Sequence, residues 1–184
     1  MVSLKEEVDR LAQPPSGYGV FLEAFEDGTG NPDPEDAPAV ALVADGPGAG
    51  GSHVLVQKWR HDLDGLLDLD DAEQEAVIGR TKLDSVELDP VPEDSHVGRM
   101  VVRDESGDEE EIWRRSVPWG GYDEHGLVFL AFAADPNRFE HMLDHMFAVG
   151  HGPEDRLLSF STAVSGGRYF APSVPDLEVA LGLR

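Results

Sequence analysis

The chain has 184 residues, a length that fits one domain or at most two small ones. Its 37 acidic and 14 basic residues give a formal charge of -23, which argues against nucleic acid or an anionic membrane as a partner, because both attract cationic surfaces. The absence of cysteine excludes disulfides, thiol nucleophiles and cysteine-ligated metal centres.

Lysine is rare among the basic residues, since only Lys5, Lys58 and Lys82 occur. An acidic, lysine-poor surface stays hydrated in concentrated salt, so a halophilic source is one interpretation, and a mesophilic protein with an acidic shell is the other. Residues 1–10 lack the basic-then-apolar plan of a secretory signal, and no apolar run is long enough to span a membrane. These features predict a cytoplasmic protein without a membrane partner.

The first half of the chain contains two predicted helices, a loop and a strand. Residues 3–12 have apolar positions at helical spacing and end before a pair of prolines, whereas residues 24–38 are dense in Gly, Pro and Asp and predict a loop. Alternating residues predict a strand over 53–59. Leucines spaced three and four apart predict one helix over 63–79, with Gly79 as its stop.

The second half begins with an acidic stretch, 84–110, that we expect to cross the surface without regular structure. Residues 136–148 predict an amphipathic helix that opens at an Asp-Pro pair. Segments with the composition of short strands lie at 111–116, 126–133, 155–161 and 168–171.

The order of these elements, β-α-β-β-α-β, is typical of a ferredoxin-like α+β fold, an antiparallel sheet with helices on one face. We expect one such domain over residues 21–184, preceded by a helix and linker over residues 1–20.

Asp27 is the first residue that could carry chemistry. It lies in FEDGTGNP, where Gly28 and Gly30 allow a tight backbone. Such a loop can present a carboxylate to a cleft, or it can be an ordinary Asx turn. A calcium-binding EF-hand loop is excluded, because Pro32 and Pro38 stand where that loop needs Gly and Glu.

His96 and Arg114 are two further candidates. Imidazole is the usual ligand of haem iron and needs an acceptor on its other nitrogen, although a lone loop histidine is more often only solvent-exposed. Arg114 and Arg115 are adjacent in a predicted strand, so their side chains point to opposite faces. An arginine that faces a cavity needs an anion there.

His141 and His145 lie four residues apart on the predicted helix and could share a metal ion. Met142 stands where a zincin helix has its Glu, so the alternative is an amphipathic helix with histidines at its edge.

Eight sequence blocks in one order identify a family. They are FEDGTGNP, GGSHVLVQKWRHDL, QEAVIGRTK, DSHVGRM, IWRRSVPWG, GLVFLAFA, FEHMLDHMF and DRLLSFSTAVSGGRYFAPS. Over residues 24–173 the chain resembles the C-terminal half of dye-decolourising haem peroxidases, most closely the P-type (class B) branch. The resemblance implies a haem b cofactor and a peroxidase that uses hydrogen peroxide and a small-molecule reductant such as a dye-like aromatic.

The resemblance also implies a role for individual residues. Asp27 would be the distal aspartate and Arg114 the distal arginine, the two catalytic residues. His96 would be the proximal ligand of the haem iron, and Asp155 would accept its imidazole N–H. The other implied haem contacts are Ser116, near the distal arginine, and four residues that would pack against the porphyrin: Leu130, Phe132, Met142 and Met146.

The chain departs from the family in two ways: Ala24 replaces the first glycine of the GxxDG motif, and only the second of the family's two ferredoxin-like halves is matched. The other half would normally cover apolar surface of this half. Without it, three interpretations of the chain are open. These are a peroxidase that forms a homo-oligomer, a truncated or split gene product, and a haem-binding or storage remnant without efficient turnover. An acidic interaction module with vestigial motifs is a further alternative. Storage needs only a histidine, so the joint presence of Asp27, Arg114 and His96 favours the enzyme.

Overall fold

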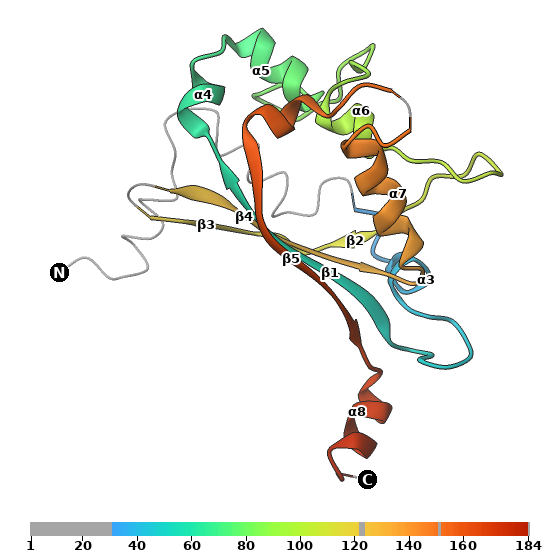
Figure 1. Cartoon of the computed structure of the whole chain (residues 1–184). Helices are drawn as coiled ribbons and strands as arrows, with labels where there is room; N and C mark the ends of the chain where they lie inside the picture. Colours follow the sequence, from blue (N-terminus) through green and yellow to red (C-terminus); the bar gives the residue numbers. More distant parts are fainter. Residues whose placement is uncertain (1–30, 122–123, 151, 184) are drawn as a thin grey trace.

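The computed structural model describes residues 31–121, 124–150 and 152–183. The predicted helix over 3–12, Asp27 and residues 24–30 of the predicted loop therefore lie outside the described residues. Figure 1 shows one sheet with helices α4 to α7 gathered on one face, and a last helix, α8, that projects from the body.

The sheet is antiparallel and has β1 (Ser52–His61) at its centre. β1 pairs with β4 (His125–Ala133) on one side and with β5 (Ser161–Ala171) on the other. The outer edge of β4 pairs first with β2 (Trp113–Arg114) and then with β3 (Val117–Gly120). Counting β2 and β3 as one interrupted strand gives the strand order of a ferredoxin-like α+β fold, so the predicted fold class is confirmed.

Side chains on β1 and β4 alternate between the two faces of the sheet, and the register decides which ones meet. Leu55 lies opposite Ala131, and Trp59 lies opposite Leu127. These residues belong to buried clusters with α7 and therefore define the helix-side face of the sheet.

Helix α7 (Asn137–Met146) covers that face and agrees with the helix predicted over 136–148. Phe139 is 2% exposed and packs among Leu55, Ala131 and Ala133. Burying a phenylalanine side chain contributes about 1.5–3 kcal/mol, so this contact is a main attachment of the helix to the sheet.

The single helix predicted over 63–79 is wrong, because the structure has two helices there, α4 (Leu63–Leu67) and α5 (Asp71–Ile78). The Asp70 carboxylate accepts from the Glu73 N–H while the Glu73 carboxylate accepts from the Asp70 N–H, which starts a new helix at this point. The predicted stop at Gly79 is confirmed, since this residue ends α5 with φ 92°.

Two further expectations are corrected where side chains cap short helical turns. The acidic stretch 84–110 contains α6 (His96–Met100), capped by Ser95, whose Oγ accepts from the Gly98 N–H. The predicted strand at 155–161 is instead a 3-10 turn over Arg156–Ser159, capped by Asp155, and β5 starts only at Ser161.

The remaining elements lie at the ends of the described chain. Helix α3 (Ala37–Ala41) begins inside the predicted loop, and α8 (Val174–Ala180) was not predicted. The predicted strand over 111–116 is reduced to the two residues of β2. Within the described ranges, no helix has both the length and the apolar character needed to cross a membrane.

Gly79 gives a test of how α5 meets α6. A Cβ at this position would lie 2.6 Å from Ser95 Oγ and 2.9 Å from Val97 Cβ, whereas Gly107 has a similar φ and nothing within 4 Å. Both Gly→Ala changes put a Cβ on a residue with left-handed backbone angles, which costs free energy. Only Gly79→Ala adds a steric clash with neighbouring atoms. Gly79→Ala should therefore lower the free energy of unfolding in urea by about 3 kcal/mol, against about 1 kcal/mol for Gly107→Ala. Equal losses would contradict close packing at this contact.

Candidate functional site

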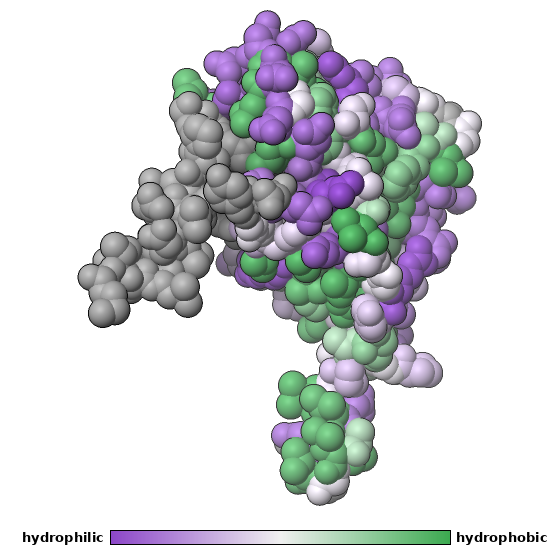
Figure 2. All heavy atoms as spheres, turned by 60° about the vertical axis from the view of Figure 1, so that its left-hand side comes forward, coloured by the Kyte–Doolittle hydropathy of each residue, from purple (hydrophilic) through white to green (hydrophobic). Residues whose placement is uncertain are grey.

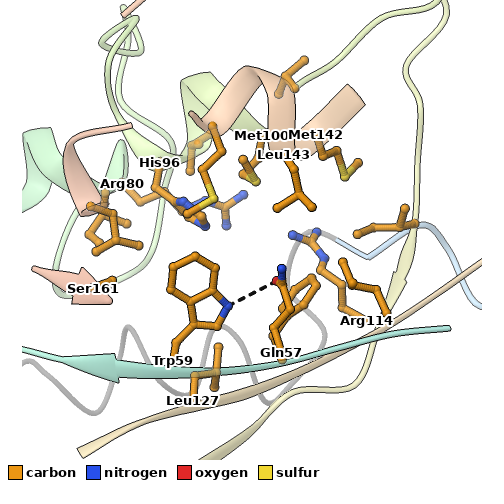
Figure 3. Close-up of a pocket in the computed structure, with 18 of the residues that line it drawn as sticks. Gln57, Trp59, Arg80, His96, Met100, Arg114, Leu127, Met142, Leu143 and Ser161 are labelled. Atoms are coloured by element: carbon orange, nitrogen blue, oxygen red, sulfur yellow. Dashed lines mark hydrogen bonds between the residues drawn. The ribbon is translucent and has the colours of Figure 1, made fainter. Parts of the chain in front are cut away.

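A largely apolar pocket lies between the helix-side face of the sheet and helices α4 to α7 (Figure 3). The sheet forms one wall and α6 and α7 form the opposite one. The pocket includes Gln57, Trp59, Leu127 and Phe129 from the sheet, His96, Val97 and Met100 from α6, and Phe139, Met142, Leu143 and Met146 from α7. Such a cavity suits a flat, mostly apolar ligand.

His96 and Asp155 meet at one end of this pocket although 59 residues separate them. His96 Nδ1 lies 2.7 Å from Asp155 Oδ2, and Asp155 is only 1% exposed. The other oxygen of Asp155 accepts from the Leu157 N–H at 2.8 Å. Because a carboxylate can only accept, Nδ1 carries the hydrogen and Nε2 is the nitrogen that can coordinate a metal.

The C-terminal end of α7 binds Asp155 and also α6, the helix that carries His96. Arg99, on α6, donates from Nε and Nη2 to the carbonyl oxygen of His145 at 3.1 and 2.7 Å. The Asp155 N–H donates to the carbonyl oxygen of Met146 at 3.0 Å. Since α6 and Asp155 are attached to the same turn of α7, the imidazole and the carboxylate keep a fixed relative position.

Arg114 lines the pocket away from His96, at the right of Figure 3. Burial lowers the pKa of Arg114 from its ordinary value, the nearby Arg80 lowers it further, and Glu109 opposes both effects. Arginine nevertheless stays protonated in proteins, so this wall carries a half-buried cation. The neighbouring Arg115 is exposed, as expected for adjacent residues of a strand.

Asn31 binds the backbone of Arg114 with both ends of its amide. Nδ2 donates to the Arg114 carbonyl oxygen at 3.0 Å, and Oδ1 accepts from the Arg114 N–H at 2.8 Å. The loop motif that contains Asp27 is thus tied, through a residue four positions later, to the strand that carries Arg114. Nothing in the sequence near Asn31 indicated this partner, which lies 83 residues away.

The other predicted contact residues divide between the two faces of the sheet. Met142 and Met146, expected to pack against a porphyrin, line the pocket. Leu130 and Phe132 do not, and the expectation that they line it is corrected, because they alternate with Leu127, Phe129 and Ala131 along β4 and point to the opposite face. Ser116 is buried but is not a lining residue, and its Oγ has no hydrogen-bond partner among the described residues.

Several pocket residues were not predicted from the sequence. Trp59 Nε1 donates to Gln57 Oε1 at 3.2 Å on the sheet wall. Arg80 directly follows Gly79, the residue that ends α5. It lines the pocket and donates to Glu87 Oε1 at 2.6 Å. The alternation of β1 could have placed Gln57 and Trp59 on one face, whereas nothing local indicated Arg80.

His61 is a titratable residue at the β5 side of the pocket. Its Nδ1 lies 2.8 Å from Ser161 Oγ. Burial, with a smaller effect of His96, lowers the pKa of His61 from 6.5 to about 4. His61 is therefore neutral at neutral pH in the folded chain.

His141 does not form the metal site considered for the pair with His145. Its Nδ1 lies 2.7 Å from Glu110 Oε2, and this hydrogen bond raises the pKa of the exposed imidazole. Across residues 31–121, 124–150 and 152–183, no group of three or more His, Asp or Glu side chains is placed to hold a metal ion.

The donor set fits haem. One imidazole has its Nδ1 held by a carboxylate, as a haem-iron ligand requires. Methionine, leucine and aromatic side chains form walls for a flat apolar ring, and Arg80 and Arg114 supply cations for carboxylates. Ser85 Oγ, buried at the same pocket and without a partner in the described part of the chain, adds an unused polar atom.

Comparison with known proteins agrees with this geometry. The family model described as "Dyp-type peroxidase, C-terminal" matches residues 21–176. The chain belongs to the Dyp-type peroxidase family. Dye-decolorizing peroxidases of Mycolicibacterium paratuberculosis and Mycobacterium tuberculosis are each 42% identical to it over 85% of this chain, and the matches cover 46% and 49% of those proteins. The chain thus spans about half the length of these curated relatives.

Solved structures give the same result for the fold. The dye-decolorizing protein from V. cholerae is 47% identical, with a TM-score of 0.79, over 85% of this chain and 53% of that chain. A DypB variant from Rhodococcus jostii RHA1, solved in complex with heme, is 43% identical with the same TM-score and the same coverage. Both share the Dyp-type peroxidase fold with this chain.

A separate similarity is short. Over 29 residues the chain is 83% identical to the proteasome-associated ATPase of Stackebrandtia nassauensis, which amounts to 16% of this chain and 5% of that protein. So small a share of the ATPase carries no functional argument.

His61 predicts how stability depends on pH in the cofactor-free chain. Its folded pKa of about 4 lies below the unfolded value of 6.5, so the unfolded state binds more protons between these values. The free energy of unfolding should fall by up to about 3 kcal/mol through this group as the pH drops from 6.5 to 4. Urea unfolding at a series of pH values should show this loss in the parent and a shallower one in His61→Asn. Identical slopes would contradict the buried neutral state.

Proposed function

We propose that this chain binds haem b and acts as a peroxidase of the dye-decolourising type, with hydrogen peroxide as oxidant and a small aromatic molecule as reductant. The observation that carries the proposal is the His96–Asp155 pair at one wall of an apolar pocket whose opposite region holds the half-buried cation of Arg114. Haem, when bound, supplies the iron that exchanges electrons with peroxide and reductant. The similarity to DypB of Rhodococcus jostii RHA1 supports assignment to the P-type branch.

On the proximal side, His96 would coordinate the iron through Nε2. Asp155 accepts the Nδ1 hydrogen, fixes the orientation of the ring and makes the imidazole a stronger electron donor. Because both carboxylate oxygens of Asp155 have partners, the buried charge is stabilised where it lies. Met142 and Met146 would pack against the ring and exclude water.

On the distal side, Asp27 and Arg114 would have two different catalytic roles. The Asp27 carboxylate would take a proton from hydrogen peroxide and return it to the departing oxygen as the O–O bond breaks. The guanidinium of Arg114 would stabilise the negative charge that develops on that oxygen. The amide of Asn31, bonded to the Arg114 backbone, supports this proposal because it ties the loop motif of Asp27 to Arg114.

A second candidate, haem binding or storage without efficient turnover, follows from the coverage of the relatives. The chain spans about half of their length, so surfaces that the other half contributes to turnover in those proteins are not matched here. Storage would need His96 and the apolar walls, but it would not need Arg114 or Asp27.

Haemin titration tests the site itself. The parent should bind one haemin per chain with a saturable Soret band. His96→Ala should weaken binding by at least about 100-fold, and Asp155→Asn by about 10- to 100-fold, because the first removes the ligand and the second its hydrogen-bond acceptor. His141→Ala, which removes an exposed imidazole from α7, is the matched control and should bind like the parent. Absence of saturable binding by the folded parent would refute the proposal.

Turnover separates the two candidate functions. Arg114→Leu and Asp27→Asn should slow peroxide consumption by about 100-fold or more, while haemin affinity stays within about threefold of the parent. Arg115→Leu removes the neighbouring, exposed guanidinium and should keep the parent rate. If all three variants consumed peroxide at the parent rate, the distal mechanism would be wrong and haem storage would be favoured.

A further inference from the structure

The C-terminal surface, defined as β5 and the residues after it through 183, exposes large apolar side chains that nothing in the described chain covers. On β5, Val164 is 54% exposed and Tyr169 is 63% exposed. From Val174 to Leu183, five more large apolar side chains are at least 44% exposed. Figure 1 shows α8 projecting away from the sheet, and Figure 2 shows it as a mostly hydrophobic knob. An apolar surface of this extent on a soluble domain marks an interaction site.

The same surface contains an open strand edge. β5 pairs with β1 along one edge, and no strand within the described residues pairs with its other edge. An eleven-residue edge of this kind presents N–H and C=O groups that a second strand can bind. Natural sheets commonly protect such edges with charged residues, but β5 has only Arg168, whose guanidinium already pairs with Glu140 of α7.

Charge decides which partner suits this surface. The whole chain has 37 acidic residues, yet residues 161–183 contain only Asp176 and Glu178, and β5 contains none. Two copies of a chain with a charge of -23 repel each other over most of their surface. An edge strand without acidic residues is a place where two copies can approach without like charges facing each other across the contact.

We propose that the C-terminal surface binds a second copy of this chain, with the β5 edges of the two copies antiparallel and each α8 packed against the partner. A two-fold axis brings the same surface of both copies together, and antiparallel pairing of identical strands satisfies that symmetry. With Phe170, which is 42% exposed, the surface has eight exposed apolar side chains. At about 100 Å² each they provide on the order of 800 Å² per copy, the share that a standard interface takes from each partner.

Salt should strengthen this association. Raising the ionic strength from about 0.1 M to about 1 M shortens the Debye length from about 10 Å to about 3 Å and screens the repulsion between the acidic bodies. The apolar contact itself does not weaken under these conditions, since salts that are excluded from protein surfaces favour burial. An interface with a basic partner would respond in the opposite direction.

The test is the mass of the purified full chain, measured by light scattering and by sedimentation equilibrium over a range of protein and salt concentrations. The parent should reach twice the chain mass of 20.0 kDa, with a dissociation constant that falls at least tenfold between the two salt conditions. Val164→Asp and Leu181→Asp should each raise this constant by about 100-fold, because the two-fold axis places every change in the interface twice. Leu83→Asp adds the same charge at a side chain that is 87% exposed elsewhere, and it should behave like the parent.

Other outcomes would overturn the proposal. A parent that stays at 20.0 kDa under all conditions, or variants that dissociate no more than Leu83→Asp, would show that this surface does not join two copies. A monomeric parent that forms a one-to-one complex with the N-terminal half of the V. cholerae protein would assign the surface to that other half instead. Circular dichroism of each variant controls for folding. The measurement needs neither haem nor turnover, so its result is independent of the proposed function.

Discussion

The hydrogen bond between His96 and Asp155 is the contact on which the geometry of the pocket depends. A carboxylate that is 1% exposed is costly unless both oxygens have partners, and His96 and the Leu157 N–H supply them. Meeting that requirement brings α6 and the 3-10 turn to the same end of α7. Met100 of α6 and Leu158 of the 3-10 turn pack against the cluster of Trp59, Leu127 and Met146, so both turns are attached to the sheet as well as to α7. The position of His96 at this end of the pocket thus follows from satisfying one buried charge.

The charges at the two ends of the pocket have opposite signs. Asp155 places a buried negative charge behind His96, whereas Arg114 places positive charge in the other region of the pocket. A low-dielectric pocket screens these charges weakly, so a field runs from one wall to the other. A carboxylate behind an imidazole favours higher positive charge on a metal, and an arginine favours negative charge on an oxygen. The arrangement suits breaking a peroxide bond between the two walls better than simple storage of an apolar ring.

The parts of the fold that were predicted correctly are those with a strong periodic pattern. β1 shows clear alternation and α7 clear helical spacing, and both lie close to their predicted positions. Helix α6 has only five residues in an acidic stretch, and the break between α4 and α5 depends on the reciprocal bonds of Asp70 and Glu73, which leucine spacing does not reveal.

Some contacts of the site were predicted and others were not, and the difference has physical reasons. The meeting of His96 with Asp155 followed from the family resemblance and not from spacing, because 59 residues separate them and no local pattern joins them. Leu130 and Phe132 were expected as haem contacts from the family resemblance, and the structure places them on the face away from the pocket. GLVFLAFA has no polar position to orient the strand, so the sequence pattern could not test this expectation. The Trp59–Leu127 register resolves the ambiguity, and that register exists only once the two strands have paired.

β5 connects the pocket with the C-terminal surface. Its first residue, Ser161, lies 2.8 Å from Nδ1 of His61 at the pocket, and its last residue, Ala171, pairs with Ser52 at the end nearest α8. An edge strand held on one side only is among the less stable parts of a sheet, because half of its backbone groups bind water. A second copy paired to the free edge would hold the strand on both sides and restrict Ser161, and through it His61. Association of two copies would then reduce the motion of the pocket wall without any contact to the ligand itself, because the restriction passes along one continuous strand.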